Sequence, residues 1–404
     1  MIVYFKKDEL LTAIGPAMGV VSNKNTVTSI EGILIDCKYG DSSEETDTCT
    51  LSAYDMEKGM RTTVAVKIDE PGNCIINAQK LHQIIKALPD GELKITVDEK
   101  MRCTIEGGKS AFELRALPGE DFPNLPELRG DRGFSVPQYI IKNFISKTAF
   151  AVGVNEQKAS FNGFYLKFKD SNITVVACDG TRLALCKKDC DVENKSSDEK
   201  PLDGSCIIPG KSMAEISKLV KDSEDQVEIY LARKHVIFKI GAVTFFSRLI
   251  EGEYFDYERI ISQSVPKGGE NHVYINPQEF KACLERAALI TEERTAGTTR
   301  AYVKLTLEDQ LMKISSVATN GSGSAYDEIA MDHRGDDMAI GFNCRYLLDA
   351  MRTCLDAGDE VKISLSGPEK GIIIVPSDKP KEKEDAEKDD FLFFVLPLRM
   401  NAAN

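Results

Sequence analysis

Apolar positions follow a strand-then-helix order three times along the chain. Each stretch opens with a β-type run, passes through one or two turn or helix-capping residues, and ends in an apolar pattern of helical period. Pro137 and Pro277 fall in the first turn of the expected helices, where proline is tolerated. The three stretches are VYFKKDELLTAIGPAM from Val3, FSVPQYIIKNFISKTAF from Phe134 and VYINPQEFKACLERAAL from Val273.

A second unit of the same kind follows each stretch, namely CIINAQKLHQIIKAL from Cys74, CIIPGKSMAEISKLV from Cys206 and IGFNCRYLLDAMRTC from Ile340. Apolar residues recur in register at the strand end and at two helical positions one turn apart, and only Ser217 breaks the pattern. Six units in register predict an internal repeat. The registers are Phe5, Ile76, Val136, Ile208, Ile275 and Phe342; Leu10, Leu81, Ile141, Met213, Phe280 and Leu347; and Ile14, Ile85, Ile145, Ser217, Leu284 and Met351.

Strand patterns occupy the chain between the expected helices. Three corresponding segments are ELKITVDEKMRCTIEGGKSAFELRAL from Glu92, QVEIYLARKHVIFKIGAVTFFSRLI from Gln226, and VKISLSGPEKGIIIV followed by FLFFVLPLRM. We expect an α+β fold of three repeated domains, residues 1–130, 131–267 and 268–404, with polar, glycine-containing boundaries at 129–133 and 266–271. Each domain has two halves that pack together to bury their apolar faces. Repeats joined head to tail predict an arc that two chains close into a ring.

Charge is distributed unevenly over this pattern. The 404 residues carry a formal net charge of −13, which argues against a broad basic surface that grips nucleic acid tightly. The six expected helical segments hold 13 basic and 6 acidic residues, a net +7, so the remainder carries −20 (−13 minus +7). A local basic surface therefore stays compatible with the acidic total. The segments are 6–19, 77–88, 137–150, 209–221, 277–290 and 344–355.

The sequence favours a cytoplasmic, globular protein. The N-terminus lacks a signal-peptide pattern, and the apolar runs are too short for a membrane helix of about 20 residues. Eleven cysteines without a secretory signal indicate reduced, buried thiols, and the single Cys186-x3-Cys190 pair is a weak zinc signal.

The candidate catalytic motifs do not have the residue spacing that their chemistry requires. Gly107–Ser110 and Gly210–Ser212 resemble the end of a phosphate loop, but Cys103 and Ser205 stand where the earlier glycine is required. The four histidines show no metal-ligand spacing, and no G-x-S-x-G occurs. We expect no catalytic residue, cofactor or metal.

Three segments have the character of a binding surface. In ITVVACDGTRLALCKK from Ile173, strands at 175–178 and 183–186 flank a two-residue Asp179-Gly180 turn. SRLIEGEYFDYERII from Ser247 places Tyr254, Phe255 and Tyr257 on a linker-like connection, and residues 391–400 form an apolar terminus. Each also has a plain structural explanation: a hairpin, interdomain packing and a docked terminal strand. The charged segment 377–390 fits a solvated loop.

The chain resembles the bacterial sliding clamp family, the beta subunits of the replicative DNA polymerase III, over essentially its whole length. The motifs that carry the resemblance are FELRALPGEDFPNLP from Phe112, ACDGTRLALCKK from Ala177, SRLIEGEYFDY, IGFNCRYLLDAM and VLPLRM. The resemblance implies a non-catalytic, head-to-tail homodimer that forms a ring of six domains around double-stranded DNA without reading its sequence. It further implies loading by a clamp loader complex, and docking of the polymerase III alpha subunit and of other polymerases and repair proteins through short peptides.

The resemblance also implies site residues. Phe255 and Thr181 depart from the family, which commonly has proline and histidine there. The peptide groove would comprise Phe161, Cys178, Gly180, Thr181, Arg182, Leu183, Phe255, Arg259, Ile260, Tyr346, Gly371, Val395, Leu396, Pro397, Leu398 and Arg399. The dimer interface would set Phe112 against Leu289 and Ile290. Expected DNA contacts, from the basic helical segments and from family position, are Lys24, Lys80, Lys86, Lys142, Lys147, Lys158, Lys211, Lys218, Arg345 and Arg352.

Two other functions remain possible at this stage. An acidic three-repeat scaffold would bind peptides without encircling DNA, and the basic helical segments weigh against it. An enzyme with a carboxylate or cysteine nucleophile is the other, and the missing phosphate-loop, metal and triad motifs weigh against that.

Overall fold

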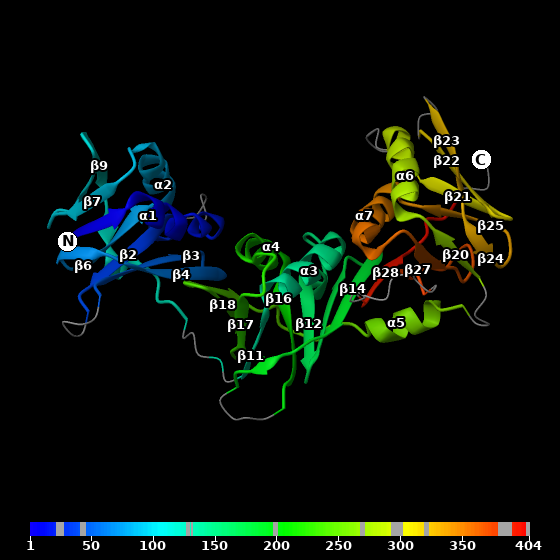
Figure 1. Cartoon of the computed structure of the whole chain (residues 1–404), viewed down its shortest axis with the longest axis horizontal. Coiled ribbons are helices and arrows are strands. Elements are labelled where there is room, and N and C mark those ends of the chain that lie inside the picture. The colour runs from blue at the N-terminus through cyan, green and yellow to red at the C-terminus, as the bar shows by residue number, and fades with distance from the viewer. Residues whose placement is uncertain are drawn as a thin grey trace. The chain divides into compact units, whose positions relative to one another are not determined.

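The computed structural model describes residues 1–21, 28–40, 46–126, 130, 132–196, 201–266, 271–291, 302–318, 323–378 and 390–400. They fall into two compact units. Figure 1 shows the helices and strands in the order of the chain. The first unit comprises Met1–Lys142, Asp191–Leu202 and Lys211–Leu249, and the second comprises Asn143–Cys190, Asp203–Gly210 and Ile250–Asn404. Strands outnumber helices in both, as the α+β prediction requires.

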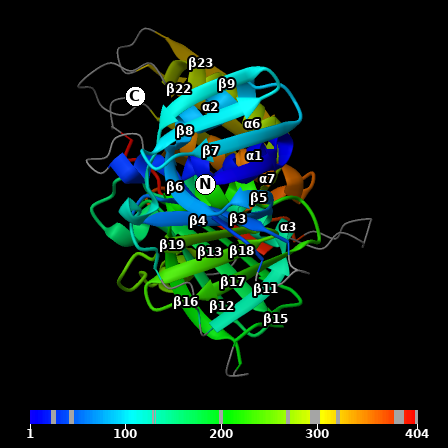
Figure 2. The ribbon, with the colours of Figure 1, turned by 90° about the vertical axis from the view of Figure 1, so that its left-hand side faces the viewer.

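Two antiparallel sheets form the first unit. The five-stranded sheet has the order β5 (Lys67–Glu70), β1 (Ile2–Lys6), β7 (Glu92–Val97), β8 (Arg102–Gly107) and β9 (Ser110–Arg115), with β9 at its edge (Figure 2). The ten-stranded sheet has the order β10 (Leu117–Pro118), β6 (Gly72–Asn77), β2 (Gly32–Lys38), β3 (Thr48–Tyr54), β4 (Lys58–Ala65), β19 (Val243–Arg248), β18 (His235–Ile240), β17 (Gln226–Leu231), β11 (Arg132–Pro137) and β15 (Glu193–Asn194).

The second unit likewise has two antiparallel sheets. The nine-stranded sheet has the order β16 (Asp203–Pro209), β12 (Gly163–Lys169), β13 (Asn172–Cys178), β14 (Arg182–Asp189), β28 (Asp390–Val395), β27 (Ile372–Pro376), β26 (Val361–Ser364), β20 (His272–Ile275) and β24 (Asp332–Arg334). The four-stranded sheet has the order β23 (Ser324–Ala330), β22 (Leu311–Val317), β21 (Val303–Glu308) and β25 (Met338–Phe342).

Seven α-helices accompany these sheets in the described part of the chain. In the first unit α1 packs against α2, and in the second α6 packs against α7. The helices are α1 (Lys7–Ile14), α2 (Ala78–Ala87), α3 (Gln138–Thr148), α4 (Gly210–Leu219), α5 (Tyr257–Ser264), α6 (Pro277–Thr291) and α7 (Cys344–Cys354). Short 3-10 turns are η1 (Pro16–Gly19), η2 (Thr28–Glu31), η3 (Gly119–Asp121), η4 (Ala149–Ala151), η5 (Ala159–Asn162) and η6 (Leu355–Ala357). No helix among the described residues is long and apolar enough to cross a membrane.

The repeated apolar registers form the core. Every residue of the three registers is buried except Ser217, which is half-buried. Burial at the strand end and at two helical positions one turn apart fixes one face of each helix against its sheet. The sequence prediction of six strand–helix units is therefore confirmed. Pro277 opens α6 as expected, whereas Pro137 is the last residue of β11 and precedes α3.

Two of the sheets run across the expected repeat boundaries. Strand β4 of the first repeat pairs with β19 of the second, and β14 of the second repeat pairs with β28 of the third. Because these joints are continuous backbone ladders, the strands of the central repeat divide between the two compact units. The three-domain boundaries therefore stay a prediction from the repeat pattern.

Candidate functional site

The hairpin between β13 and β14 is held closed by Asp179. Its carboxylate accepts hydrogen bonds from the backbone N–H of Thr181 (2.9 Å), the Thr181 hydroxyl (2.7 Å) and the N–H of Arg182 (3.0 Å). The N–H of Asp179 donates to the carbonyl of Arg182, so Gly180 and Thr181 are the central turn residues. The expected Asp179-Gly180 turn is thus displaced by one residue, because Gly180 supplies the positive φ of +89° at the first central position.

Arg182 links this turn to α7. Its guanidinium binds Asp179 at 2.9 Å and Asp349 at 2.8 Å, and it lies over the Tyr346 ring at 4.4 Å from the centroid. The side chains of the arginine and of Asp179 are each only 12% exposed. A planar fork with two carboxylate partners holds a defined orientation, so the turn and the helix keep a fixed spacing.

An aromatic wall stands beside the hairpin. The Phe161 and Phe255 rings meet edge to face at 5.4 Å, and Tyr254 stacks on Tyr165 at 4.7 Å. The ammonium of Lys158 lies 4.9 Å above Phe161 and 5.4 Å above Phe255. Phe255 is therefore an integral part of the wall, and the wall carries a positive charge at its rim.

The stretch expected as a linker after Phe255 forms helix α5. Asp256 caps it by accepting a hydrogen bond from the N–H of Arg259 at 3.0 Å. Tyr257 is buried, whereas Ile260 is 38% exposed. The signal for this helix was an N-cap aspartate followed by YERIISQS, whose apolar residues lie at helical spacing.

The apolar terminus, residues 391–400, forms the wall opposite the aromatic wall. Strand β28 pairs with β14 on one side and β27 on the other, which buries Val395. Beyond the strand, the N–H of Leu396 donates to the carbonyl of Thr181 (2.9 Å) and that of Leu398 to the carbonyl of Gly341 (2.8 Å). These two bonds hold the terminal segment against the hairpin and leave Leu396 39% exposed.

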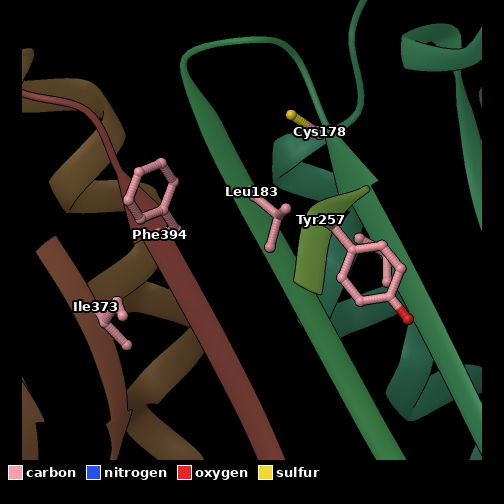
Figure 3. Close-up of a cluster of buried hydrophobic side chains, with 6 residues drawn as sticks. Cys178, Leu183, Tyr257, Ile373 and Phe394 are labelled. Atoms are coloured by element: carbon pink, nitrogen blue, oxygen red, sulfur yellow. The ribbon is translucent and has the colours of Figure 1, made fainter. Parts of the chain in front are cut away.

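A groove of about 650 Å³ lies between these walls. Its floor rests on a buried apolar cluster that includes Cys178, Leu183, Tyr257, Ile373 and Phe394 (Figure 3). The lining residues are Lys158, Phe161, Cys178, Gly180, Thr181, Arg182, Leu183, Phe255, Ile260, Gln263, Ser264, Glu369, Lys370, Gly371, Phe394 and Leu396. An apolar trough with a few polar rim groups suits an extended apolar peptide.

The structure brings most of the expected groove residues together. Ten line the groove: Phe161, Cys178, Gly180, Thr181, Arg182, Leu183, Phe255, Ile260, Gly371 and Leu396. The other six are not among the lining residues: Arg259, Tyr346, Val395, Pro397, Leu398 and Arg399. The sequence reasoning missed Gln263, Ser264, Glu369, Lys370 and Phe394, and it assigned Lys158 to DNA. Ile260, Gln263 and Ser264 belong to α5, a helix that the sequence analysis does not predict.

Burial affects the pKa of one thiol and two phenols in and beside the groove. Burial raises the pKa of the Cys178 thiol to about 11, although the N–H of Gly180 opposes this by donating to the sulfur. Burial likewise raises the pKa of Tyr254 and of Tyr257. Among the described residues no group of three or more His, Cys, Asp or Glu is placed to hold a metal ion. The geometry supports binding through shape and apolar contact.

Most of the expected DNA-contact residues are exposed. Lys218 pairs with Glu215 at 2.9 Å and Arg352 with Glu285 at 3.4 Å, and Lys24 lies outside the described residues. The exposed residues are Lys80, Lys86, Lys142, Lys158, Lys211, Lys218, Arg345 and Arg352.

Lys147 is a correction to the expected DNA contacts. Its side chain is only 2% exposed, its ammonium donates to the carbonyl of Thr353 at 2.9 Å, and it lies over the Phe391 ring. Helical spacing put it on the expected basic face, but tertiary packing turns it inward. It cannot reach a phosphate from this position.

The expected interface residues are apolar side chains that face solvent. Phe112 on edge strand β9 is 39% exposed, and Leu289 on α6 is 76% exposed beside a half-buried Ile290. The position equivalent to Phe112 in the second repeat is Phe245 on β19, which is 1% exposed and lies opposite Met60 of β4. The exposure of Phe112 and Leu289 is compatible with the expected interface, which stays a prediction.

Comparison with known proteins identifies related sequences over nearly the whole chain. Three models of the DNA polymerase III beta subunit match: the N-terminal domain at residues 1–126, the central domain at 135–256 and the C-terminal domain at 262–387. The beta sliding clamp of Bacillus subtilis is 28% identical over 379 residues, covering 93% of this chain and 96% of the relative. That of Pseudomonas aeruginosa is 28% identical over 397 residues, covering 98% and 99%.

Solved structures show the same likeness. The DNA polymerase sliding clamp from Bacillus subtilis superposes with a TM-score of 0.85 at 26% identity, covering 99% of this chain and 100% of that one. A Pseudomonas aeruginosa clamp bound to griselimycin superposes with a TM-score of 0.84 at 28% identity and the same coverage.

Proposed function

The chain belongs to the family of bacterial DNA polymerase III beta subunits, the replicative sliding clamps, and we propose that two copies join head to tail into a closed ring around duplex DNA. The ring tethers the polymerase to its template. It has no catalytic residue of its own, and processivity comes from topology.

A repeated strand joint carries this proposal. Each repeat contains an equivalent run of three consecutive strands, and the third strands of these runs are β4, β14 and β23. The last strands of the three repeats are also equivalent, and they are β9, β19 and β28. β4 pairs with β19, and β14 pairs with β28. In the described part of the chain, β9 and β23 are left at the edges of their sheets. Within one chain, the last strand of one repeat pairs with the third strand of another. The same pairing between two copies joins β9 of one copy to β23 of the other.

The chemistry of these edges supports the same pairing. An unpaired strand offers backbone donors and acceptors to another strand, and proteins normally protect such edges. Phe112 on β9 is exposed where its equivalent Phe245 is buried by a neighbouring strand. Helix α6, which carries Leu289 and Ile290, packs against β22 and β23, so these residues lie beside the second edge. A second copy would bury all three.

Loose contact with DNA fits the charge distribution. Affinity and its salt dependence grow with the number of phosphates that a protein neutralises. The exposed Lys80, Lys86, Lys142, Lys211 and Lys218 supply a modest positive charge on a chain of net charge −13. We propose that these residues, with Arg345 and Arg352, face the DNA and allow sliding, in the cytoplasm at the nucleoid.

The groove supports the proposed partners. Short, extended peptides of the polymerase III alpha subunit and of other polymerases and repair proteins would lie in it, and a clamp loader would open the ring. The apolar floor of Leu183 and Phe394 accepts aliphatic or aromatic side chains, while Lys158 at the rim favours acidic neighbours.

Retention on circular DNA tests the proposal. Purified protein is placed on primed circular DNA by a clamp loader, and the circle is then closed or cut with a restriction enzyme. We expect the protein to stay on the closed circle. After the circle is cut, we expect the protein to slide off the free ends. Equal retention on circular and linear DNA, or none on either, would contradict encirclement and favour a peptide-binding scaffold.

A further inference from the structure

Two cysteines face each other across the first hairpin of the ten-stranded sheet. Cys37 on β2 and Cys49 on β3 are direct partners in the antiparallel register. Their sulfur atoms are 3.1 Å apart, and the residues are 1% and 0% exposed. Packed, nonbonded carbon atoms sit at roughly 3.5–4.0 Å, so the two sulfurs are in unusually close contact.

We propose that Cys37 and Cys49 are an oxidation site that forms a cross-strand disulfide. Directly opposed residues of antiparallel strands have Cα atoms about 4.5–5.5 Å apart. Disulfides need Cα atoms about 4.4–6.8 Å apart. The backbone therefore already meets the requirement, and only the sulfurs have to close on each other.

The register distinguishes this pair from the other cysteines. Cys74 lies opposite Ile35, and Cys103 lies opposite Val97 and Leu114. In the ladders that the described residues form, no other cysteine has a cysteine as its direct partner. Cys74 is on the same sheet and is equally buried, so it serves as the matched control.

A small-molecule disulfide such as glutathione disulfide is a sufficient oxidant. One protein thiolate attacks it, forms a mixed disulfide and releases one glutathione. The second protein thiolate then attacks the protein sulfur and releases the other glutathione, so two protein thiols are oxidised and one glutathione disulfide is reduced.

Reaction depends on opening of the hairpin end. The hydrogen bond with Cys37 and burial raise the pKa of the Cys49 thiol, which keeps thiolate scarce in the closed sheet. The pair lies one rung from the end of the β2–β3 ladder, at Lys38 and Thr48. Opening of that end, which also has to release Cys37 from Gly72 of β6 and Cys49 from Val64 of β4, exposes both sulfurs together. Oxidation is therefore slow and becomes faster as pH rises.

The disulfide closes a short loop in the unfolded chain and thus favours the folded state. It fixes β3 against β2 inside the sheet. Strand β4, which pairs with β3, carries the joint to β19. Oxidation would therefore secure the sheet that connects the first two repeats.

Peptide mapping of the full-length protein tests the inference. The protein is incubated with glutathione disulfide at mildly alkaline pH, the remaining thiols are alkylated in denaturant, and peptides are analysed by mass spectrometry. We expect loss of two of the eleven thiols, a peptide that links Cys37 to Cys49, and an unfolding temperature that rises and returns after reduction. Cys74→Ala should preserve the link and Cys49→Ala should abolish it.

Two outcomes would overturn the inference. One is a linked peptide that joins other cysteines in place of this pair. The other is retention of all eleven thiols in the native protein under conditions in which hydrogen exchange shows the β2–β3 hairpin to open. Both readouts use the unmodified chain, so they do not depend on any variant folding.

Discussion

At the residue scale, Arg182 sets the geometry of the groove. Its guanidinium bridges the hairpin turn to α7 through Asp179 and Asp349, and its flat face covers Tyr346. The same side chain lines the groove. One residue thus fixes the hairpin turn against α7 and lines the groove.

Replacement of Arg182 tests this role. Arg182→Met leaves two half-buried carboxylates without their shared partner, and we expect the free energy of unfolding to fall by about 2 kcal/mol. Urea denaturation measures it. Arg102→Met, which removes an exposed ion pair with Asp98, is the control and should change stability by less than about 0.5 kcal/mol. Equal effects of the two substitutions would refute the bridging role.

A second residue-scale prediction concerns pH. Hydrogen bonds from Lys362 (2.7 Å) and Tyr274 (2.6 Å) hold the pKa of Asp378 at about 2. An aspartate in an unfolded chain titrates near about 3.9. The depressed pKa in the folded state means that the stabilisation is present above about pH 4 and is lost as pH falls towards about 2.

Thermal unfolding of Asp378→Asn against the native sequence measures this contribution. We expect the variant to unfold at a lower temperature at pH 6, with the difference shrinking between about pH 4 and about pH 2. A difference that is constant over that range would show that the charge of Asp378 is not the source.

At the element scale, α5 and the terminal segment decide whether the groove exists. Helix α5 places Ile260, Gln263 and Ser264 along one side, and Leu396 completes the other. Both are short elements held by few hydrogen bonds. They are the parts of the site most open to change by a single substitution or truncation.

The cap of α5 gives the first element-scale prediction. Asp256→Ala removes the acceptor for the N–H of Arg259 and should lower stability by about 1 kcal/mol, with weaker peptide binding. Asp256→Asn keeps an equally good cap and should retain both properties. Fluorescence anisotropy with a labelled peptide of the polymerase III alpha subunit measures the affinity, and loss of affinity in both variants would contradict a capping role.

Truncation of the terminal segment gives the second element-scale prediction. Removal of residues 396–404 deletes Leu396 and the bonds to Thr181 and Gly341, so we expect peptide binding to be abolished while the dimer persists. Removal of residues 401–404 alone keeps those contacts and should leave peptide affinity intact. The same anisotropy assay, with light scattering for mass, checks both, and unchanged affinity after the longer truncation would refute the groove assignment.

At the scale of the whole molecule, the proposed assembly depends on two of the sheet edges, β9 and β23. β9 and β23 are equivalent to strands that are paired elsewhere in the chain. The acidic total of −13 applies to the whole surface and does not describe the local basic residues. The proposed ring closure and loose DNA contact would therefore belong to the assembled dimer.

Phe112→Lys tests assembly directly. A charge at an edge that has to be buried should shift the protein from dimer to monomer at micromolar concentration, because an unpaired buried charge is costly. Val154→Lys alters another exposed apolar residue (78% exposed) and should leave the dimer intact. Analytical ultracentrifugation measures both. A dimer that survives Phe112→Lys unchanged would refute the proposed edge.

The sequence by itself determined the repeat and the core, and its resemblance to the sliding clamp family supplied the expected groove residues. Periodicity is a local property, and a residue such as Leu81 or Leu347 is buried wherever its helix meets a sheet. The family motifs then pointed to the hairpin, the aromatic segment and the terminus. Local patterns singled out these three segments, and the resemblance assigned them to one groove.

Only the tertiary structure decided which elements join and which charges face outward. The backbone ladder of β14 with β28 links residues far apart in sequence, and no local pattern encodes such a pairing. Lys147 has the spacing of a surface lysine, yet the carbonyl of Thr353 and the Phe391 ring enclose it. Helical period fixes the face of a helix, whereas burial depends on what packs against that face.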